Sequence, residues 1–140
     1  DSYFNNRALS IGESFFNIGN INYKMKKFNK SLTNYNKSLE LFSLVENFYA
    51  NSFIANSHHK LAKTYLKLND NKKALYEFEK SLEKYNIIIE FDDDEEILDI
   101  KPDLEKLTKD ILEFKINTDN EEDFYKLYSK YTNIFVMFNN

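Results

Sequence analysis

Apolar residues recur every three or four positions along most of this chain, the spacing that places side chains on one face of an α-helix. The pattern breaks at Lys26–Lys27 and at Asn69–Asn71, where polar residues suited to turns interrupt it. The sequence therefore predicts helices over residues 5–25, 28–46, 49–68, 71–90, 102–116 and 121–138. Because the chain has only two glycines and one proline, it lacks the turns of a sandwich or barrel, and we expect an all-α fold of antiparallel helical hairpins.

The first four predicted helices form two pairs that repeat with a shift of 43 residues. The shift aligns small residues with small ones and large apolar residues with large ones: Ile18 with Leu61, Gly19 with Ala62, Met25 with Leu68, Ser31 with Ala74, Leu32 with Leu75, Tyr35 with Phe78, Ser38 with Ser81 and Leu39 with Leu82. A single helical hairpin cannot bury its apolar faces alone. We therefore expect the pairs to stack, with Ile18 and Met25 on the buried side of the first helix.

These patterns divide the chain into three parts. We expect two repeated hairpins over residues 1–90, an acidic linker over 91–101 and a third hairpin over 102–140. The proline of the third hairpin fits the first turn of a helix. Asp123 and Lys130 stand where small residues belong, so the third hairpin is either a degenerate repeat or a capping pair.

The two repeated hairpins resemble the tetratricopeptide repeat (TPR) family. Its motif places a large residue, Leu-Gly and Tyr on the first helix, and Ala, an aromatic residue and Ala on the second. The first copy here reads Phe15, Ile18–Gly19, Ser31, Tyr35 and Ser38, with Asn22 where tyrosine is usual, and the second reads His58, Leu61–Ala62, Tyr65, Ala74, Phe78 and Ser81. The resemblance covers residues 15–85. It implies a right-handed superhelix that binds a peptide or protein segment, with His58 packed in the core.

The long repeat and the run Phe16–Asn20 are similar to those of the RRNPP group of bacterial pheromone-sensing regulators, which includes the Rap phosphatases. This resemblance implies that asparagines on the inner helices hold the backbone of a short signalling peptide. The chain would then be the sensor part of a regulator whose N-terminal effector domain is missing. The chain begins with Asp1 rather than Met, which also leads us to expect a piece of a longer protein.

The first and third predicted helices carry polar and aromatic residues one step off their apolar stripes, where they would face a groove. We expect peptide binding by Phe16, Asn17, Asn20, Tyr23, Asn56, His59, Lys60, Lys63 and Lys67. Asparagine amides donate to and accept from a peptide backbone, lysines attract carboxylates, and aromatic rings offer apolar contact. Two alternatives stay open: these residues are merely solvated helix faces, or the hairpins are a scaffold for a multiprotein assembly without a small-peptide ligand.

The composition argues against several other functions. The chain has no cysteine, no Gly-rich phosphate loop and no nucleophile motif, and its two histidines are adjacent on a helix and point apart. We therefore predict no catalytic residue, cofactor or metal. The net charge of −4 argues against nucleic-acid binding. No signal peptide or membrane-length apolar run is present, so we expect a cytoplasmic protein without a membrane partner; a homo-oligomer is left open.

Overall fold

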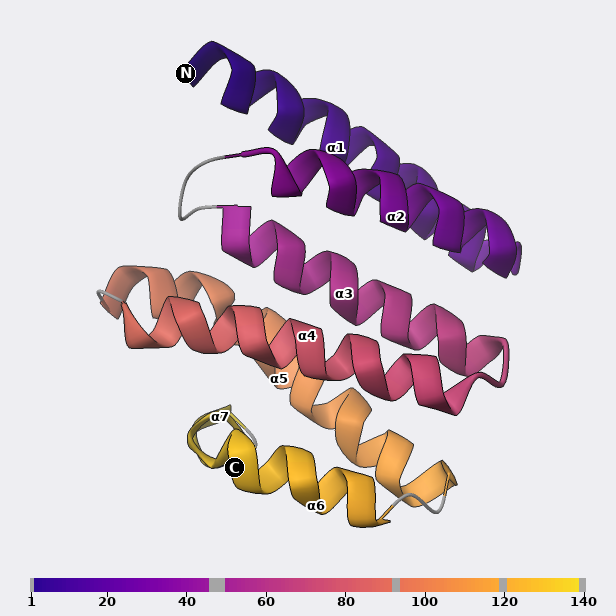
Figure 1. Cartoon of the computed structure of the whole chain (residues 1–140), viewed down its shortest axis with the longest axis vertical. Helices are drawn as coiled ribbons and strands as arrows, with labels where there is room; N and C mark the ends of the chain where they lie inside the picture. The colour runs from indigo at the N-terminus through magenta and orange to yellow at the C-terminus, as the bar shows by residue number, and fades with distance from the viewer. Residues whose placement is uncertain (1, 46–49, 92–93, 119–120, 139–140) are drawn as a thin grey trace.

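The computed structural model describes residues 2–45, 50–91, 94–118 and 121–138, and over these ranges the chain is almost entirely helical. Its helices are α1 (Ser2–Lys24), α2 (Phe28–Ser43), α3 (Ala50–Lys67), α4 (Asn71–Glu90), α5 (Asp94–Thr118), α6 (Glu121–Lys130) and α7 (Thr132–Phe138). Figure 1 shows α1 to α4 laid out in chain order, with α5 passing behind α4 towards α6. The predicted all-α architecture of packed helical hairpins is confirmed.

The turns inside the two repeated hairpins share one backbone conformation. Lys26, after α1, and Asn69, after α3, have positive φ angles of 61° and 60°, and they lie 43 positions apart in the chain. In both turns the next amide donates to a carbonyl five positions earlier, over 2.8 Å in the first turn and 2.9 Å in the second. The repeat seen in the side chains therefore extends to the backbone.

Two glycines allow α1 and α2 to pack closely. A Cβ atom on Gly19 would lie 2.6 Å from the ring of Tyr35, and one on Gly12 would lie 2.5 Å from the ring of Phe42. Real Cβ atoms essentially never come this close to another heavy atom, so each aromatic ring occupies the space that a side chain on α1 would need. A larger residue at either position would force the ring or the helix to shift.

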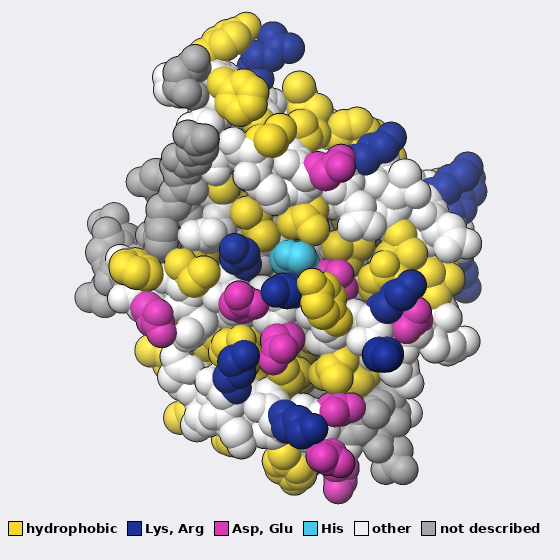
Figure 2. All heavy atoms as spheres, in the orientation of Figure 1, with side chains coloured by type: hydrophobic (Ala, Val, Ile, Leu, Met, Phe, Trp, Pro, Cys, Tyr) yellow, Lys and Arg dark blue, Asp and Glu magenta, His cyan; other side chains and the backbone are white. Residues whose placement is uncertain are grey.

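The opposite side of α1 is more exposed than the sequence predicted. Ile18 and Met25, expected on the buried side, are 44% and 55% exposed. The buried residues of α1 are Ala8, Gly12 and Gly19. The apolar spacing identifies the apolar face of a helix but not whether another helix covers that face. In Figure 1, α1 lies at one end of the row of helices. Figure 2 shows hydrophobic side chains gathered at that end of the molecule, whereas basic and acidic side chains alternate over the middle.

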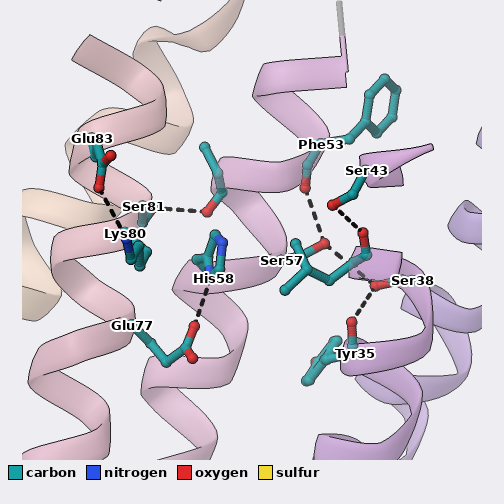
Figure 3. A network of polar contacts seen from close by, with 12 residues as sticks. Tyr35, Ser38, Ser43, Phe53, Ser57, His58, Glu77, Lys80, Ser81 and Glu83 are labelled. Atoms are coloured by element: carbon teal, nitrogen blue, oxygen red, sulfur yellow. Dashed lines mark hydrogen bonds and ion pairs between the residues drawn. The ribbon is translucent and has the colours of Figure 1, made fainter. Parts of the chain in front are cut away.

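Serine hydroxyls connect the helices at their crossings. The Ser31 hydroxyl of α2 donates to the Gly19 carbonyl of α1 over 3.1 Å. The hydroxyls of Ser38 and Ser57 lie 3.4 Å apart and link α2 to α3, and the Ser81 hydroxyl of α4 donates to a backbone carbonyl of α3 over 2.7 Å (Figure 3). All four serines are buried, so these hydrogen bonds satisfy polar groups that the close crossings bury.

The buried side chains form two clusters. The smaller cluster lies between α1, α2 and α3 and includes Phe42 and Ile54. The larger one joins α3 and α4 to the C-terminal helices and includes Phe78, Leu82 and Ile134. The second hairpin therefore shares a core with α5, α6 and α7. The division of the chain into three repeat units at the expected boundaries stays a prediction.

The secondary structure after α4 differs from the prediction. Helix α5 begins at Asp94 rather than at Pro102, so most of the expected linker over 91–101 is helical. The two residues before Asp94 lie outside the described ranges. Ile100 is buried together with Leu104, so the apolar stripe of α5 starts before the proline. Burial of this longer stripe offsets the backbone hydrogen bond that a proline inside a helix removes.

The last predicted helix, over 121–138, is divided into α6 and α7 at Tyr131, and both helices pack on α5. The Thr132 hydroxyl donates to the carbonyls of Tyr128, over 2.7 Å, and of Ser129, over 3.2 Å. A threonine hydroxyl that bonds to carbonyls of the preceding turn competes with the helical hydrogen-bond pattern. These bonds occur at the residue that opens α7, where the helix is interrupted.

Candidate functional groove

The facing sides of α1 and α3 form a groove that continues to α5, with three neighbouring cavities along it. The amide cavity, of about 300 Å³, is lined by Glu13, Phe16, Asn17, Phe42, Phe53 and Asn56. The lysine cavity, of about 380 Å³, is lined by Asn20, Tyr23, Lys24, Tyr35, Lys60 and Lys63. The mixed-charge cavity, of about 710 Å³, is lined by Tyr23, Lys63, Leu66, Lys67, Asn69, Asn71, Asp110, Glu113, Phe114 and Asn117.

The amide cavity combines polar sides with aromatic walls. Asn17 of α1 is exposed, and Asn56 of α3 is half-buried. The rings of Phe42 and Phe53 pack with their centroids 5.1 Å apart, and Phe16 packs on Tyr35. Amides at both sides can pair with backbone groups of an extended segment, while the rings accept an apolar side chain.

The lysine cavity is positively charged, with three ammonium groups and no carboxylate among its lining residues. Burial lowers the pKa of Lys60, and the positive charges of Lys63 and Lys106 lower it further, although the negative charges of Asp110 and Asp103 partly oppose them. The Tyr35 hydroxyl donates to the Asn20 amide oxygen over 2.5 Å. This bond occupies the oxygen of Asn20 and leaves its amide N–H groups as donors at the edge of the cavity.

The mixed-charge cavity places acidic residues of α5 opposite lysines of α3. The Lys63 ammonium lies 3.7 Å from the Asp110 carboxylate. Burial alone would raise the pKa of Asp110, but the hydrogen bond with His59 and the positive charges nearby outweigh it and lower the pKa. Burial raises the pKa of Tyr23, and the negative charge of Asp110 adds to the effect. Asp110 therefore stays ionised at neutral pH and marks the acidic side of the groove.

Of the two adjacent histidines, His59 departs more clearly from its expected position than His58. His59, predicted to face the groove, is 4% exposed and lies 2.7 Å from Asp110 through its Nε2 atom. Burial lowers the pKa of His59, although Asp110 acts in the opposite direction, so the ring is neutral at pH 7 and Nε2–H donates to the carboxylate. His58, predicted in the core, is half-buried and forms a 2.6 Å contact with Glu77 of α4 (Figure 3).

Eight of the nine predicted site residues line the three cavities, and His59 is the exception. Sequence reasoning missed the contribution of α5, whose Asp110 and Glu113 line the mixed-charge cavity. Glu105, Lys106 and Lys109 of the same helix are exposed, and none of them lines the three cavities.

Other kinds of site receive no support from the residues that the structure describes. This part of the chain contains no group of three or more His, Cys, Asp or Glu side chains placed to hold a metal ion. None of its helices combines the length and the apolar character that a membrane span requires.

Comparison with known proteins supports the fold. A family model described as tetratricopeptide repeat matches residues 10–86, which run from α1 through most of α4. No curated protein and no solved structure matches the chain. Tetratricopeptide repeats generally mediate protein–protein interactions and generally act without catalysis of their own. The match covers more than half of the chain and coincides with the two hairpins that repeat in sequence and in backbone, so the chain belongs to the tetratricopeptide repeat family.

Proposed function

We propose that this chain binds an acidic peptide segment in the groove between α1, α3 and α5. The observation that carries the proposal is the lysine cavity. Lys60 is half-buried, burial lowers its pKa, and none of the ion pairs in the described part of the chain includes it. A partly buried ammonium without a close counter-ion is unfavourable. A ligand carboxylate that entered this cavity would add a negative charge beside Lys24 and Lys60, whereas Lys63 already lies close to Asp110.

The neighbouring amide cavity supports a peptide as the carrier of that carboxylate. Asn17 and Asn56 lie on facing helices and can hold the peptide backbone from both sides. The rings of Phe16 and Phe53 accept an apolar side chain next to the acidic one. Since Asn20 continues the row of amides along α1 into the lysine cavity, one extended segment can contact both cavities.

The mixed-charge cavity at the far end of the groove carries charges of both signs. Asp110 and Glu113 repel a second carboxylate there, whereas Lys63 and Lys67 on the opposite side attract one. A peptide with one acidic residue and an uncharged or basic continuation therefore fits better than a uniformly acidic one. This charge arrangement gives the groove a preference that solvated helix faces would lack.

Selection from a library of short random peptides tests this function. We expect the selected peptides to share an acidic residue beside an apolar one, and to bind Lys60→Glu at least tenfold more weakly, which corresponds to about 1.4 kcal/mol. Lys37→Glu makes the same charge change on α2, away from the three cavities, and should leave the affinity unchanged. Equal losses in the two variants, or selected peptides without acidic residues, would contradict the proposal.

A narrower form of the proposal is that the ligand is a signalling peptide and the chain is the sensor part of a pheromone-responsive regulator. Its support is that the run Phe16–Asn20 resembles a run in the RRNPP group of pheromone-sensing regulators. Three residues of this run, Phe16, Asn17 and Asn20, line the groove. A sensor must change when it binds, whereas an anchoring module need not. Small-angle scattering with and without a selected peptide separates the two, since the sensor should change its radius of gyration.

A further inference from the structure

The solvent side of α1 carries a stripe of exposed apolar residues. The α1 stripe comprises Phe4, Ile11, Ile18, Ile21 and Met25, each between 41% and 56% exposed. Near its N-terminal end a cavity of about 450 Å³ opens between Phe4 and Ile11 of the stripe and two leucines, Leu41 of α2 and Leu44 directly after it. Figure 2 shows hydrophobic side chains gathered at this end of the molecule. Exposed apolar residues that share one helix face in this way are typical of an interaction site.

The internal repeat indicates what type of surface covers such a stripe. The shift of 43 residues carries Ile11 onto Ile54 and Ile18 onto Leu61. Both residues of α3 are buried, with 9% and 0% exposure, and α2 packs on α3 in the antiparallel direction. The same face that is covered in the second repeat is thus exposed in the first. A helix that runs antiparallel to α1 would complete it.

The spacing within the α1 stripe suits a second α1 helix in that role. Phe4, Ile11, Ile18 and Met25 follow one another at intervals of seven residues, so the row has the same spacing when read in either direction. A two-fold contact requires this property, because each residue must meet its counterpart in both copies. In an antiparallel pair, Ile11 of one protomer lies beside Ile18 of its partner, and Phe4 beside Met25.

The charges on this side of α1 do not oppose the pairing. Arg7 lies between Phe4 and Ile11 in the sequence and on the same side of α1, and its Nη1 atom donates to the Tyr3 hydroxyl over 3.1 Å. In the antiparallel arrangement the two Arg7 residues would be about 22 Å apart along the helices, at a rise of about 1.5 Å per residue. This distance exceeds the Debye length of about 8 Å at physiological ionic strength, so their repulsion is largely screened.

We propose that the α1 stripe is the contact between two copies of this chain, with the two α1 helices antiparallel about a two-fold axis. Phe4 and Met25 are about 32 Å apart along the helix, at about 1.5 Å per residue, so the contact is a single helix pair. Such a contact lies at the small end of specific interfaces, and the dimer therefore depends on protein concentration. Asn17 and Asn20 lie on another side of α1 and line the groove, so each protomer keeps its groove open.

Sedimentation velocity of the 140-residue chain, from micromolar to millimolar concentration, tests the proposal. We expect the mass to rise from 16.8 kDa towards twice that value as the concentration increases. Ile11→Lys and Ile18→Lys should each weaken dimerisation at least tenfold without loss of helical circular dichroism, because both side chains are exposed. Ile116→Lys, at a 76% exposed position of α5, should not affect it. A chain that stays monomeric, or a dimer that tolerates both α1 variants, would overturn the proposal and leave the stripe to a helix of another protein.

Disulfide trapping tests the direction of the two helices, since the chain has no cysteine of its own. An equimolar mixture of the Ile11→Cys and Ile18→Cys chains should form mainly the mixed disulfide dimer under mild oxidation. Each variant alone should cross-link slowly. Faster cross-linking of either variant with itself would mean a parallel or unrelated contact, and would refute the antiparallel pair.

Discussion

Replacing Gly19 by alanine adds one atom, a Cβ, at the crossing of α1 and α2. The added Cβ would lie 2.6 Å from Cε1 of Tyr35 and 2.7 Å from its Cδ1. The ring cannot move away easily, because Tyr35 is 1% exposed, its hydroxyl is bonded to Asn20 and it packs on Phe16. Overpacking of this kind costs about 1–3 kcal/mol, and the pinned ring places Gly19→Ala in the upper half of that range.

The helical preference of alanine over glycine offsets about 1 kcal/mol of this cost. We therefore expect Gly19→Ala to lower the free energy of unfolding by about 1–2 kcal/mol, which for a chain of this size lowers Tm by about 3–8 °C. Thermal and urea unfolding followed by circular dichroism measure both quantities. Asn17→Ala is the matched control, since Asn17 is exposed on the same helix and should change stability by less than about 0.5 kcal/mol.

A double-mutant cycle assigns the cost to the contact itself. Tyr35→Leu removes the ring atoms that the new Cβ would meet, so Gly19→Ala should cost little in that background. A Gly19→Ala chain that melts at or above the wild-type temperature would show that the Tyr35 ring is not pinned. An equal loss of stability with and without the Tyr35 ring would show that the cost does not come from this contact.

Three further predictions concern the core, the buried histidine and the groove. Leu82→Ala should lower the free energy of unfolding by about 2–5 kcal/mol in urea denaturation, because the side chain is fully buried; a loss below about 1 kcal/mol would contradict the packing. Burial lowers the pKa of His59 below its ordinary 6.5, so as the pH falls the imidazole of the unfolded chain is protonated before that of the folded chain. The free energy of unfolding should therefore decrease as the pH drops from about 7.5 to about 5. His59→Gln should flatten this part of the Tm–pH curve, and an unchanged slope would count against the buried neutral ring. Asn20→Ala should cost about 1–2 kcal/mol of stability in thermal unfolding because Tyr35 loses its acceptor, whereas Asn17→Ala should affect only peptide binding; equal stability of the two variants would argue against the bond to Tyr35.

The apolar spacing predicted the first four helices well, because amphipathic periodicity is a local property of the chain. The same spacing could not tell which faces would be covered, since that depends on neighbours. Ile18 and Leu61 occupy equivalent positions of the repeat. Leu61 is fully buried on α3, against which α2 of the preceding hairpin packs, whereas Ile18 is exposed. His59 was misplaced for a related reason: its burial depends on Asp110, which lies 51 positions away in the chain.

The groove residues on α1 and α3 could be predicted because they follow from the repeat. Gly19 and Ala62 face the partner helix of their hairpins. Because helix geometry fixes the angle between side chains, this also fixes which neighbouring residues point towards the groove. The contribution of α5 could not be obtained in this way, because α5 starts before its proline and its register does not follow the repeat. Asp110 and Glu113 therefore became visible as groove residues only in the folded chain.

The central claim is that a peptide lies in the groove between α1, α3 and α5, and amide chemical-shift mapping with a selected acidic peptide tests it most directly. We predict that the largest shifts fall on residues lining the amide and lysine cavities, with Asn17, Asn56 and Lys60 among them, and that Lys60→Glu abolishes them at the same peptide concentration. Shifts confined to the α1 stripe or to the outer sides of α2 and α4, with these cavities unaffected, would contradict the claim.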